Sequence, residues 1–145
     1  MESPDPALLR ALRTALAERP EVLEAYLFGS QARGDARPGS DVDVAVYVEE
    51  AALQVPGFGY DSEIGATLQK ALKRSDVDIV ILNSAPPLLY YRVLHDGVRI
   101  VSRDLVATTT RAGRALSRYY DYVPVLAKLE RAYARRRSPT GQSGP

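Results

Sequence analysis

Hydrophobic residues recur along the chain in short blocks whose spacing alternates between that of helices and that of strands. Leucines three and four positions apart predict an amphipathic helix from Pro6 to Arg19, and Pro20 follows its last turn. The next block, Val22 to Phe28, is apolar and aromatic apart from Glu24, and it ends at Gly29. Such a run predicts a strand. The chain is therefore expected to begin with a helix followed by a strand.

A strict alternation marks the segment from residue 41 to residue 48. Asp41 and Asp43 fall on one face, and four valines fall on the other. This period of two predicts a strand that carries both acids on the same face. The stretch between the two strands, residues 30–40, is rich in glycine and arginine, so we expect a loop or a short helical turn there.

The remaining blocks again predict helices that alternate with strands. We expect a mobile loop over 49–59, followed by a helix that is capped by Asp61 or Ser62 and runs to about Arg74. A strand is expected over Val77–Leu82. After it we expect a helix that Pro86 and Pro87 begin and Gly97 ends, and then a strand over Val98–Val101. From about Asp104 to Arg137 the spacing is helical again, and Pro124 is expected to kink or split this segment. The pattern predicts one α/β (α+β) domain over 1–137, followed by a disordered tail over 138–145.

Composition narrows the classes of function. The chain has 145 residues, no cysteine, and 19 basic against 18 acidic residues, for a net charge of +1. Thiolate metal sites, disulfides and a cysteine nucleophile are therefore excluded. The nearly neutral charge does not favour direct binding of nucleic acid, and no apolar run is long enough to span a membrane. We expect a soluble cytoplasmic protein.

The two acids have the spacing of a metal site for phosphoryl transfer. Carboxylates at i and i+2 on a strand lie about 6.6 Å apart at the backbone, so both can reach a pair of divalent cations. Oxygen ligands favour magnesium, with manganese as a substitute. Gly29 and Ser30 stand ten residues before Asp41, where a glycine backbone and a hydroxyl can hold phosphate oxygens. An isolated Asp-x-Asp is usually a pair of solvated acids, but this combination favours a nucleotidyl-transfer site.

A third carboxylate is needed to complete the metal ligands, and two candidates follow one helix later. Asp76 and Asp78 have the same strand parity, so alternation does not separate them. Asp78 lies inside an apolar run, where a carboxylate needs compensation such as a bound metal. We therefore favour Asp78 and interpret Asp76 as a residue that forms turn hydrogen bonds at the start of the strand.

The segment Gly29-Ser-Gln-Ala-Arg-Gly-Asp-Ala-Arg-Pro-Gly-Ser-Asp-Val-Asp43, with Val77-Asp78-Ile79-Val80, resembles the minimal nucleotidyltransferase (MNT) family of the DNA polymerase beta superfamily. Within that family the chain is most similar to the antitoxins of HEPN/MNT toxin–antitoxin pairs. The resemblance implies a small mixed sheet flanked by helices. It also implies that Asp41, Asp43 and Asp78 are catalytic and hold two magnesium ions, and that Gly29 and Ser30 hold ATP. We expect Arg33, through its charge, and Ser40 to add contacts to the nucleotide from the same loop.

By the same resemblance, the reaction is transfer of AMP from ATP to a tyrosine hydroxyl of a cognate HEPN ribonuclease toxin, which silences the toxin in a hetero-oligomer. Two alternatives stay open. The protein could neutralise its partner by binding alone, or it could modify a small molecule as the aminoglycoside nucleotidyltransferases do. The basic run of Arg131, Arg135, Arg136 and Arg137 is typical of a solvated helix end, although an acidic toxin surface or RNA is another interpretation.

Overall fold

The computed structural model describes residues 4–35, 37, 39–54 and 59–137. Along the chain the elements are α1 (Pro6–Ala17), β1 (Val22–Phe28), α2 (Ser30–Arg33), β2 (Val42–Val48), the 3-10 helix η1 (Glu50–Gln54), α3 (Tyr60–Leu72), β3 (Val77–Ile81), the 3-10 helix η2 (Leu82–Ser84), α4 (Pro87–Asp96), β4 (Val98–Ser102) and α5 (Leu105–Arg137). Within this part of the chain, no helix has both the length and the apolar character needed to cross a membrane.

The four strands form one mixed sheet in the order β3-β2-β1-β4. β1 lies antiparallel to both β2 and β4, whereas β2 and β3 are parallel. The register places Phe28 at the end of β1 opposite Asp43 of β2, and Asp43 beside Asp78 of β3. The predicted mixed sheet flanked by helices is confirmed. Its register brings the end of β1 and two acids into one row across three strands.

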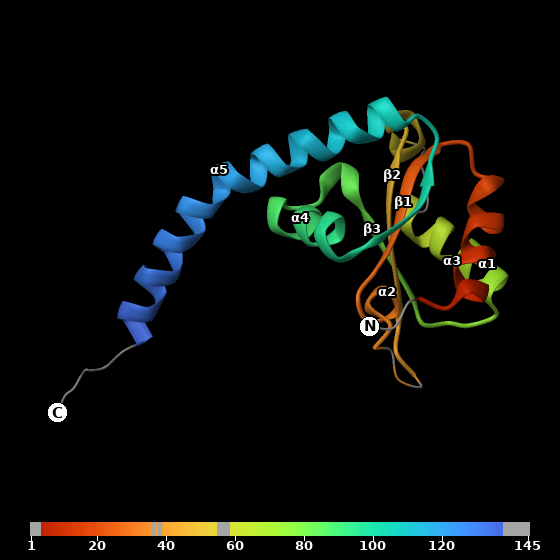
Figure 1. Ribbon diagram of the computed structural model, residues 1–145, viewed down its shortest axis with the longest axis horizontal. Coiled ribbons are helices and arrows are strands. Elements are labelled where there is room, and N and C mark those ends of the chain that lie inside the picture. The colour runs from red at the N-terminus through yellow and green to blue at the C-terminus, as the bar shows by residue number, and fades with distance from the viewer. Residues whose placement is uncertain (1–3, 36, 38, 55–58, 138–145) are drawn as a thin grey trace.

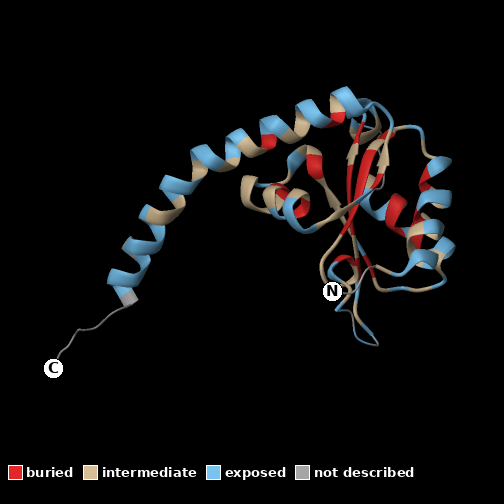
Figure 2. Cartoon of the chain, in the orientation of Figure 1, coloured by how far each residue is buried: buried red, intermediate tan, exposed pale blue. Residues whose placement is uncertain are grey.

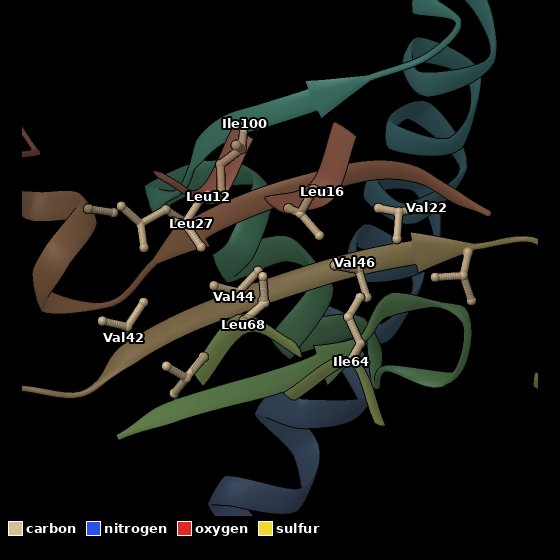
Figure 3. Packing of buried hydrophobic residues seen from close by; sticks show 14 residues of the cluster. Leu12, Leu16, Val22, Leu27, Val42, Val44, Val46, Ile64, Leu68 and Ile100 are labelled. Atoms are coloured by element: carbon tan, nitrogen blue, oxygen red, sulfur yellow. The ribbon is translucent and has the colours of Figure 1, made fainter. Parts of the chain in front are cut away.

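One face of the sheet carries the main hydrophobic core. Figure 1 shows the sheet nearly edge-on, with α1 and α3 together on this side. Leu12 and Leu16 of α1 and Ile64 and Leu68 of α3 are fully buried against the valines of β2. Figure 3 shows these side chains meeting between the two helices and the strands. Burying each leucine stabilises the fold by roughly 1.5–3 kcal/mol relative to exposing it, so this face anchors the strands that carry the acids.

The opposite face is covered by α4 and the first half of α5 (Figure 1). A second buried cluster lies there and includes Tyr26, Ala45, Tyr90 and Val93. Glu24 is also fully buried on this side of β1. Both faces of β1 and β2 are therefore covered along most of their length.

Two predicted features are wrong. Residues 50–54 of the predicted mobile loop form η1 instead, and residues 55–58 lie outside the described part of the chain. The helix α3 begins at Tyr60, with Gly59 as its N-cap, so neither Asp61 nor Ser62 is the cap. The Asp61 carboxylate accepts the amide of Ser62 in the first turn, at 2.9 Å. With extended Gly59 as its N-cap, the helix begins two residues earlier than a cap at Asp61 would allow and three residues earlier than a cap at Ser62 would allow.

The last helix, α5, is continuous over 33 residues and contains Pro124, so the proline does not split it. Proline removes one backbone hydrogen bond and its ring displaces the preceding turn. Figure 1 shows the axis of α5 changing direction between its two halves, which agrees with the predicted kink. The predicted disordered tail, 138–145, lies outside the described residues.

Candidate active site at the end of the sheet

The turn after β1 passes directly over a carboxylate of the neighbouring strand. Gly29 has φ 75° and ψ −158°, a conformation that residues with a side chain rarely adopt. A Cβ at this position would overlap the Asp43 carboxylate oxygen. The chain then forms the short helix α2, which ends at Gly34 in the left-handed region, with φ 75°. Glycine is thus required at residue 29 both by the backbone and by the close approach to Asp43.

The three predicted acids come together at this end of the sheet. Asp43 is half-buried on β2 beside Asp78 of β3, and Asp41 is exposed just before β2 begins. Partial burial raises the pKa of Asp43, the negative charges of Asp78 and Asp41 raise it further, and Arg33 opposes them. The charges of Asp41 and Asp78 therefore bear directly on Asp43.

None of these three carboxylates is neutralised within the described part of the chain. Hydrogen bonds and ion pairs occupy nearby acids such as Asp35 and Asp76, but none is formed by the side chains of Asp41, Asp43 or Asp78. A group of like charges without a cation is unfavourable unless it binds one from solution. Their oxygen donors are of the type that magnesium prefers.

The described residues hold no ready-made cage of three acidic or histidine side chains for a metal ion. The charges of Asp41 and Asp78 act on Asp43, yet the three carboxylates do not converge on one point. The donor set therefore fits a divalent cation only if further oxygen ligands complete the coordination. Magnesium usually keeps several waters or substrate phosphates among its ligands, so the arrangement suits a metal that arrives with a nucleotide.

Asp76, the alternative third acid, has a different environment. The Nε and Nη2 of Arg74 donate hydrogen bonds of 2.6 and 2.7 Å to its two carboxylate oxygens, and this pairing lowers the pKa of Asp76. Arg74 also donates to the carbonyl of Ser40, at 2.8 Å, and so ties the start of β3 to the loop before β2. Asp76 thus stabilises the fold through its pairing with Arg74, whereas the Asp78 carboxylate is available to bind a ligand.

The predicted nucleotide-binding residues lie around α2 but are not equally available. Ser30 is half-buried at the first position of α2. Arg33 forms an exposed ion pair with Asp35 at 3.3 Å, and its positive charge also acts to lower the pKa of Asp43. The Ser40 hydroxyl accepts the amide of Arg37 at 2.8 Å, so it closes the loop. Of these residues, Arg33 is therefore the one whose charge acts on Asp43, whereas the Ser40 hydroxyl is already hydrogen-bonded within the loop.

Sequence reasoning missed a hollow beside the strand that carries Asp78. An open hollow of about 410 Å³ lies between α3 and β3, and it is lined by Asp61, Ser62, Gly65, Ala66, Gln69, Asp78 and Ile79. The signal was present as small and polar residues four apart on one face of the helix, at positions 61, 65 and 69. Asp78 shares the strand parity of Val80, which packs on the α4 and α5 face, so its side chain lies on the other face of the sheet from α3, and the hollow borders the site at the edge of β3.

Comparison with known proteins agrees with this geometry. Residues 10–105 match the family described as Polymerase beta, Nucleotidyltransferase. The protein adenylyltransferase MntA of Shewanella oneidensis is 33% identical over 81 residues, which are 56% of this chain and 55% of that protein, so the match spans about half of that relative's length.

Two solved structures are similar over nearly their whole chains. A chain in the crystal structure of a toxin–antitoxin with AMP-PNP has a TM-score of 0.70 and 26% identity, covering 87% of this chain and 98% of its own. A chain in the structure of a tri-AMPylated Shewanella oneidensis HEPN toxin with its MNT antitoxin has a TM-score of 0.65 over 88% of this chain and 98% of its own, and at 23% identity it supports the fold alone. The fold, the site geometry and the family match together show that this chain belongs to the polymerase beta nucleotidyltransferase family.

Proposed function

We propose that this protein transfers AMP from ATP to a tyrosine hydroxyl of a HEPN toxin partner and thereby silences the toxin. The observation that carries the proposal is the glycine turn at residue 29 packed on Asp43, within a group of acids that no described residue neutralises. Such an arrangement suits a triphosphate that brings its own magnesium. We assign Asp41, Asp43 and Asp78 to the metal and the reacting groups.

Each residue has a distinct task in this proposal. The backbone at Gly29 lets a phosphate approach closely, and the hydroxyl of Ser30 donates to a phosphate oxygen. Arg33 adds positive charge near the same oxygens. Two magnesium ions bound by the carboxylates would supply neutralisation of the charge that develops on the phosphates.

The bond changes are those of an in-line displacement. The acceptor oxygen attacks the α-phosphorus, the bond from that phosphorus to the oxygen bridging the β-phosphate breaks, and pyrophosphate leaves with the electron pair. Asp78 accepts the hydroxyl proton, because it is exposed beside Asp43 at the end of the sheet, where an acceptor can approach.

Two comparisons support the nucleotide and the partner. The relative from Shewanella oneidensis is a protein adenylyltransferase, and the similar chain at 26% identity belongs to a toxin–antitoxin that holds the ATP analogue AMP-PNP. The sequence resemblance to HEPN/MNT antitoxins supports a HEPN protein as the acceptor. We propose that the protein acts in the cytoplasm together with this partner.

The test is an incubation of the purified protein with ATP, magnesium and its cognate HEPN protein, read by intact mass. We expect the HEPN protein to gain one or more AMP units. Asp41→Ala and Asp43→Ala should reduce transfer by roughly 100- to 1,000-fold or more, since preorganised charge stabilisation is lost. Asp35→Ala and Asp76→Ala remove neighbouring carboxylates that are already paired, so they serve as matched controls.

Two outcomes would contradict the proposal. Transfer by the wild-type protein with all divalent metal chelated would exclude the metal-dependent reaction. Full rescue of cells from the toxin by a folded Asp41→Ala variant, at equal expression, would instead show neutralisation by binding alone.

A further inference from the structure

Asp41 lies at the margin of the sheet. It is exposed and comes one residue before β2 begins at Val42, whereas Asp43 lies inside the strand beside Asp78. Gly39, two residues earlier, has φ 88°, which is not a strand conformation. Figure 2 shows that the buried middle of the sheet gives way to half-buried and exposed residues at this end. A metal ligand in such a place needs support from outside its own strand, because ligand geometry must be held closely.

The residue before Asp41 is held by all of its polar groups. The Ser40 amide donates to the carbonyl of Arg37 at 2.9 Å, and the Ser40 hydroxyl accepts the amide of Arg37 at 2.8 Å. The Ser40 carbonyl accepts from Nη2 of Arg74 at 2.8 Å and from Nε2 of Gln31, on α2, at 3.3 Å. This carbonyl thus joins the start of β2 both to α2 and to the segment between α3 and β3.

The residue after Asp41 is bound to the same segment. The amide of Val42 donates to the backbone carbonyl of Asp76 at 2.8 Å. Arg74 and Asp76 are joined in turn by the two hydrogen bonds between the guanidinium and the carboxylate. In Figure 1 the link between α3 and β3 lies at the same end of the sheet as α2. Residues 40 and 42 are therefore both bound to residues 74–76, and Asp41 lies between them.

Arg74 is itself held by the end of α3. Lys73 caps that helix in the left-handed region, with φ 57°. The amide of Arg74 donates to the carbonyl of Gln69 at 3.1 Å, and the Gln69 side chain donates to the carbonyl of Ser75 at 3.2 Å. The Arg74 side chain is 32% exposed. Its planar guanidinium can bind a carboxylate and a carbonyl at once, which a single ammonium group does not match.

We propose that Arg74 is a positioning residue of this site: through the Ser40 carbonyl it holds Asp41 where Asp41 can bind the same cations as Asp43. That Asp41 binds a cation rests on the proposed function. Arg74 acts here through the backbone and not on the nucleotide. The loss of a residue that orients a metal ligand typically lowers metal affinity about 10- to 100-fold, although the ligand itself is unchanged.

The positive charge of Arg74 would act in the opposite direction. The charges of Asp41 and Arg74 interact, so removing the guanidinium makes the site more negative. If the charge alone mattered, Arg74→Met would therefore strengthen cation binding. Loss of positioning weakens it. The sign of the change thus separates the two roles.

The experiment measures binding of manganese to the full chain in the presence of AMP-PNP, by electron paramagnetic resonance of the free ion. Arg74→Met should raise the Kd for manganese at least about tenfold, and the magnesium concentration for half-maximal AMP transfer should rise with it. Arg74→Lys keeps the charge but not the fork of donors, so we expect a smaller rise of about two- to fivefold. Asp76→Ala leaves Arg74 able to donate to the Ser40 carbonyl and should raise the Kd less than Arg74→Met does.

Arg103→Met is the matched control. Arg103 lies beside the start of β1, at the other end of the sheet, and its guanidinium also donates to backbone carbonyls, those of Leu16 at 2.7 Å, Val22 at 3.0 Å and Arg19 at 3.2 Å. Arg103→Met should destabilise the protein, as thermal unfolding measures, yet change the manganese Kd less than about twofold, because it is remote from the acids. If Arg74→Met fails to fold, Arg74→Lys decides, since it leaves the charge in place.

The outcomes separate positioning from the proposed reaction. A Kd of Arg74→Met, or of Arg74→Lys in its place, that is no higher than that of the wild type would overturn the positioning role and leave the proposed function standing. An equal rise in Arg103→Met would overturn it too, because that rise would follow from lost stability. Manganese binding that depends on Arg74, without AMP transfer by the wild type, would retain the positioning role and refute the proposed function. A wild type that binds no manganese would refute both.

Discussion

Two carboxylates on adjacent strands, Glu24 and Asp43, have opposite environments. Glu24 of β1 is fully buried, yet it accepts hydrogen bonds from Arg111 of α5, at 2.5 Å, and from Tyr26, at 2.6 Å. The Arg111 guanidinium also lies 4.6 Å from the ring centre of Tyr47. Asp43 of β2 is only half-buried, but no described residue neutralises it. A carboxylate that is satisfied within the chain holds the fold together, whereas one left unsatisfied is available to a ligand.

The buried pair is where a substitution should affect stability most. Arg111→Met removes the donor to Glu24 and leaves a buried carboxylate without its cation, which should lower the free energy of unfolding by about 3–5 kcal/mol. Urea unfolding measures this change. Arg114→Met removes an exposed arginine from the same helix and is the matched control. A loss from Arg111→Met no larger than that of the control would show that the pair does not anchor α5.

The glycine turn should be next in size. Gly29→Ala forces a side chain into a positive-φ conformation and against Asp43, so we expect a loss of about 1–3 kcal/mol together with loss of ATP binding. Gly39 also has positive φ, at 88°, but a Cβ there would meet nothing within 4 Å. Gly39→Ala therefore reports backbone strain alone. Equal effects of the two substitutions on ATP binding would contradict a specific role for the turn over Asp43.

A smaller effect of opposite sign is expected at Asp43 itself. Because its pKa is raised above the ordinary value of 3.8, the folded protein binds more protons than the unfolded chain as pH rises from that value through the raised pKa. Stability contributed by this group therefore falls as pH increases through that window. Metal-free Asp43→Asn should be more stable than the wild type at neutral pH and equal to it below the window.

Adding magnesium gives a second test of the repulsion among the acids, through the stability of the wild type and of Asp43→Asn. It should stabilise the wild type, by mass action on the folded state, more than it stabilises Asp43→Asn. Thermal unfolding with EDTA and with magnesium, at acidic and neutral pH, gives the four comparisons. A wild type that is the more stable protein at neutral pH without metal would contradict the repulsion among the acids.

The smallest effect should come from the exposed pair near the site. Arg33 and Asp35 are both more than half exposed, at 52% and 61% of their side chains. Asp35→Asn should change the free energy of unfolding by less than about 0.5 kcal/mol, since exposed ion pairs contribute little. Urea unfolding at low and high salt tests this, and a larger or strongly salt-dependent change would assign the pair a structural role.

Local patterns determined much of this protein. The alternation from residue 41 to residue 48, the apolar run of β1 and the leucine spacing of α1 each predict an element that the structure contains. The Gly-Ser turn and the Asp-x-Asp were sufficient to indicate the family, because strand periodicity places two acids on one face. These features depend on residues close together in the chain, so they can be read without the fold.

Contacts between distant segments needed the tertiary structure. Asp76, just before β3, and Asp78 on it have the same sequence parity, and only the Arg74 pairing and the register with Asp43 separate them. Glu24 and Arg111 are 87 residues apart, so their bond is invisible to any local pattern. The sequence alone determined which residue types can hold a metal-bound nucleotide. Tertiary structure decided which carboxylates remain unpaired for it, because neutralisation depends on neighbours in space rather than on neighbours along the chain.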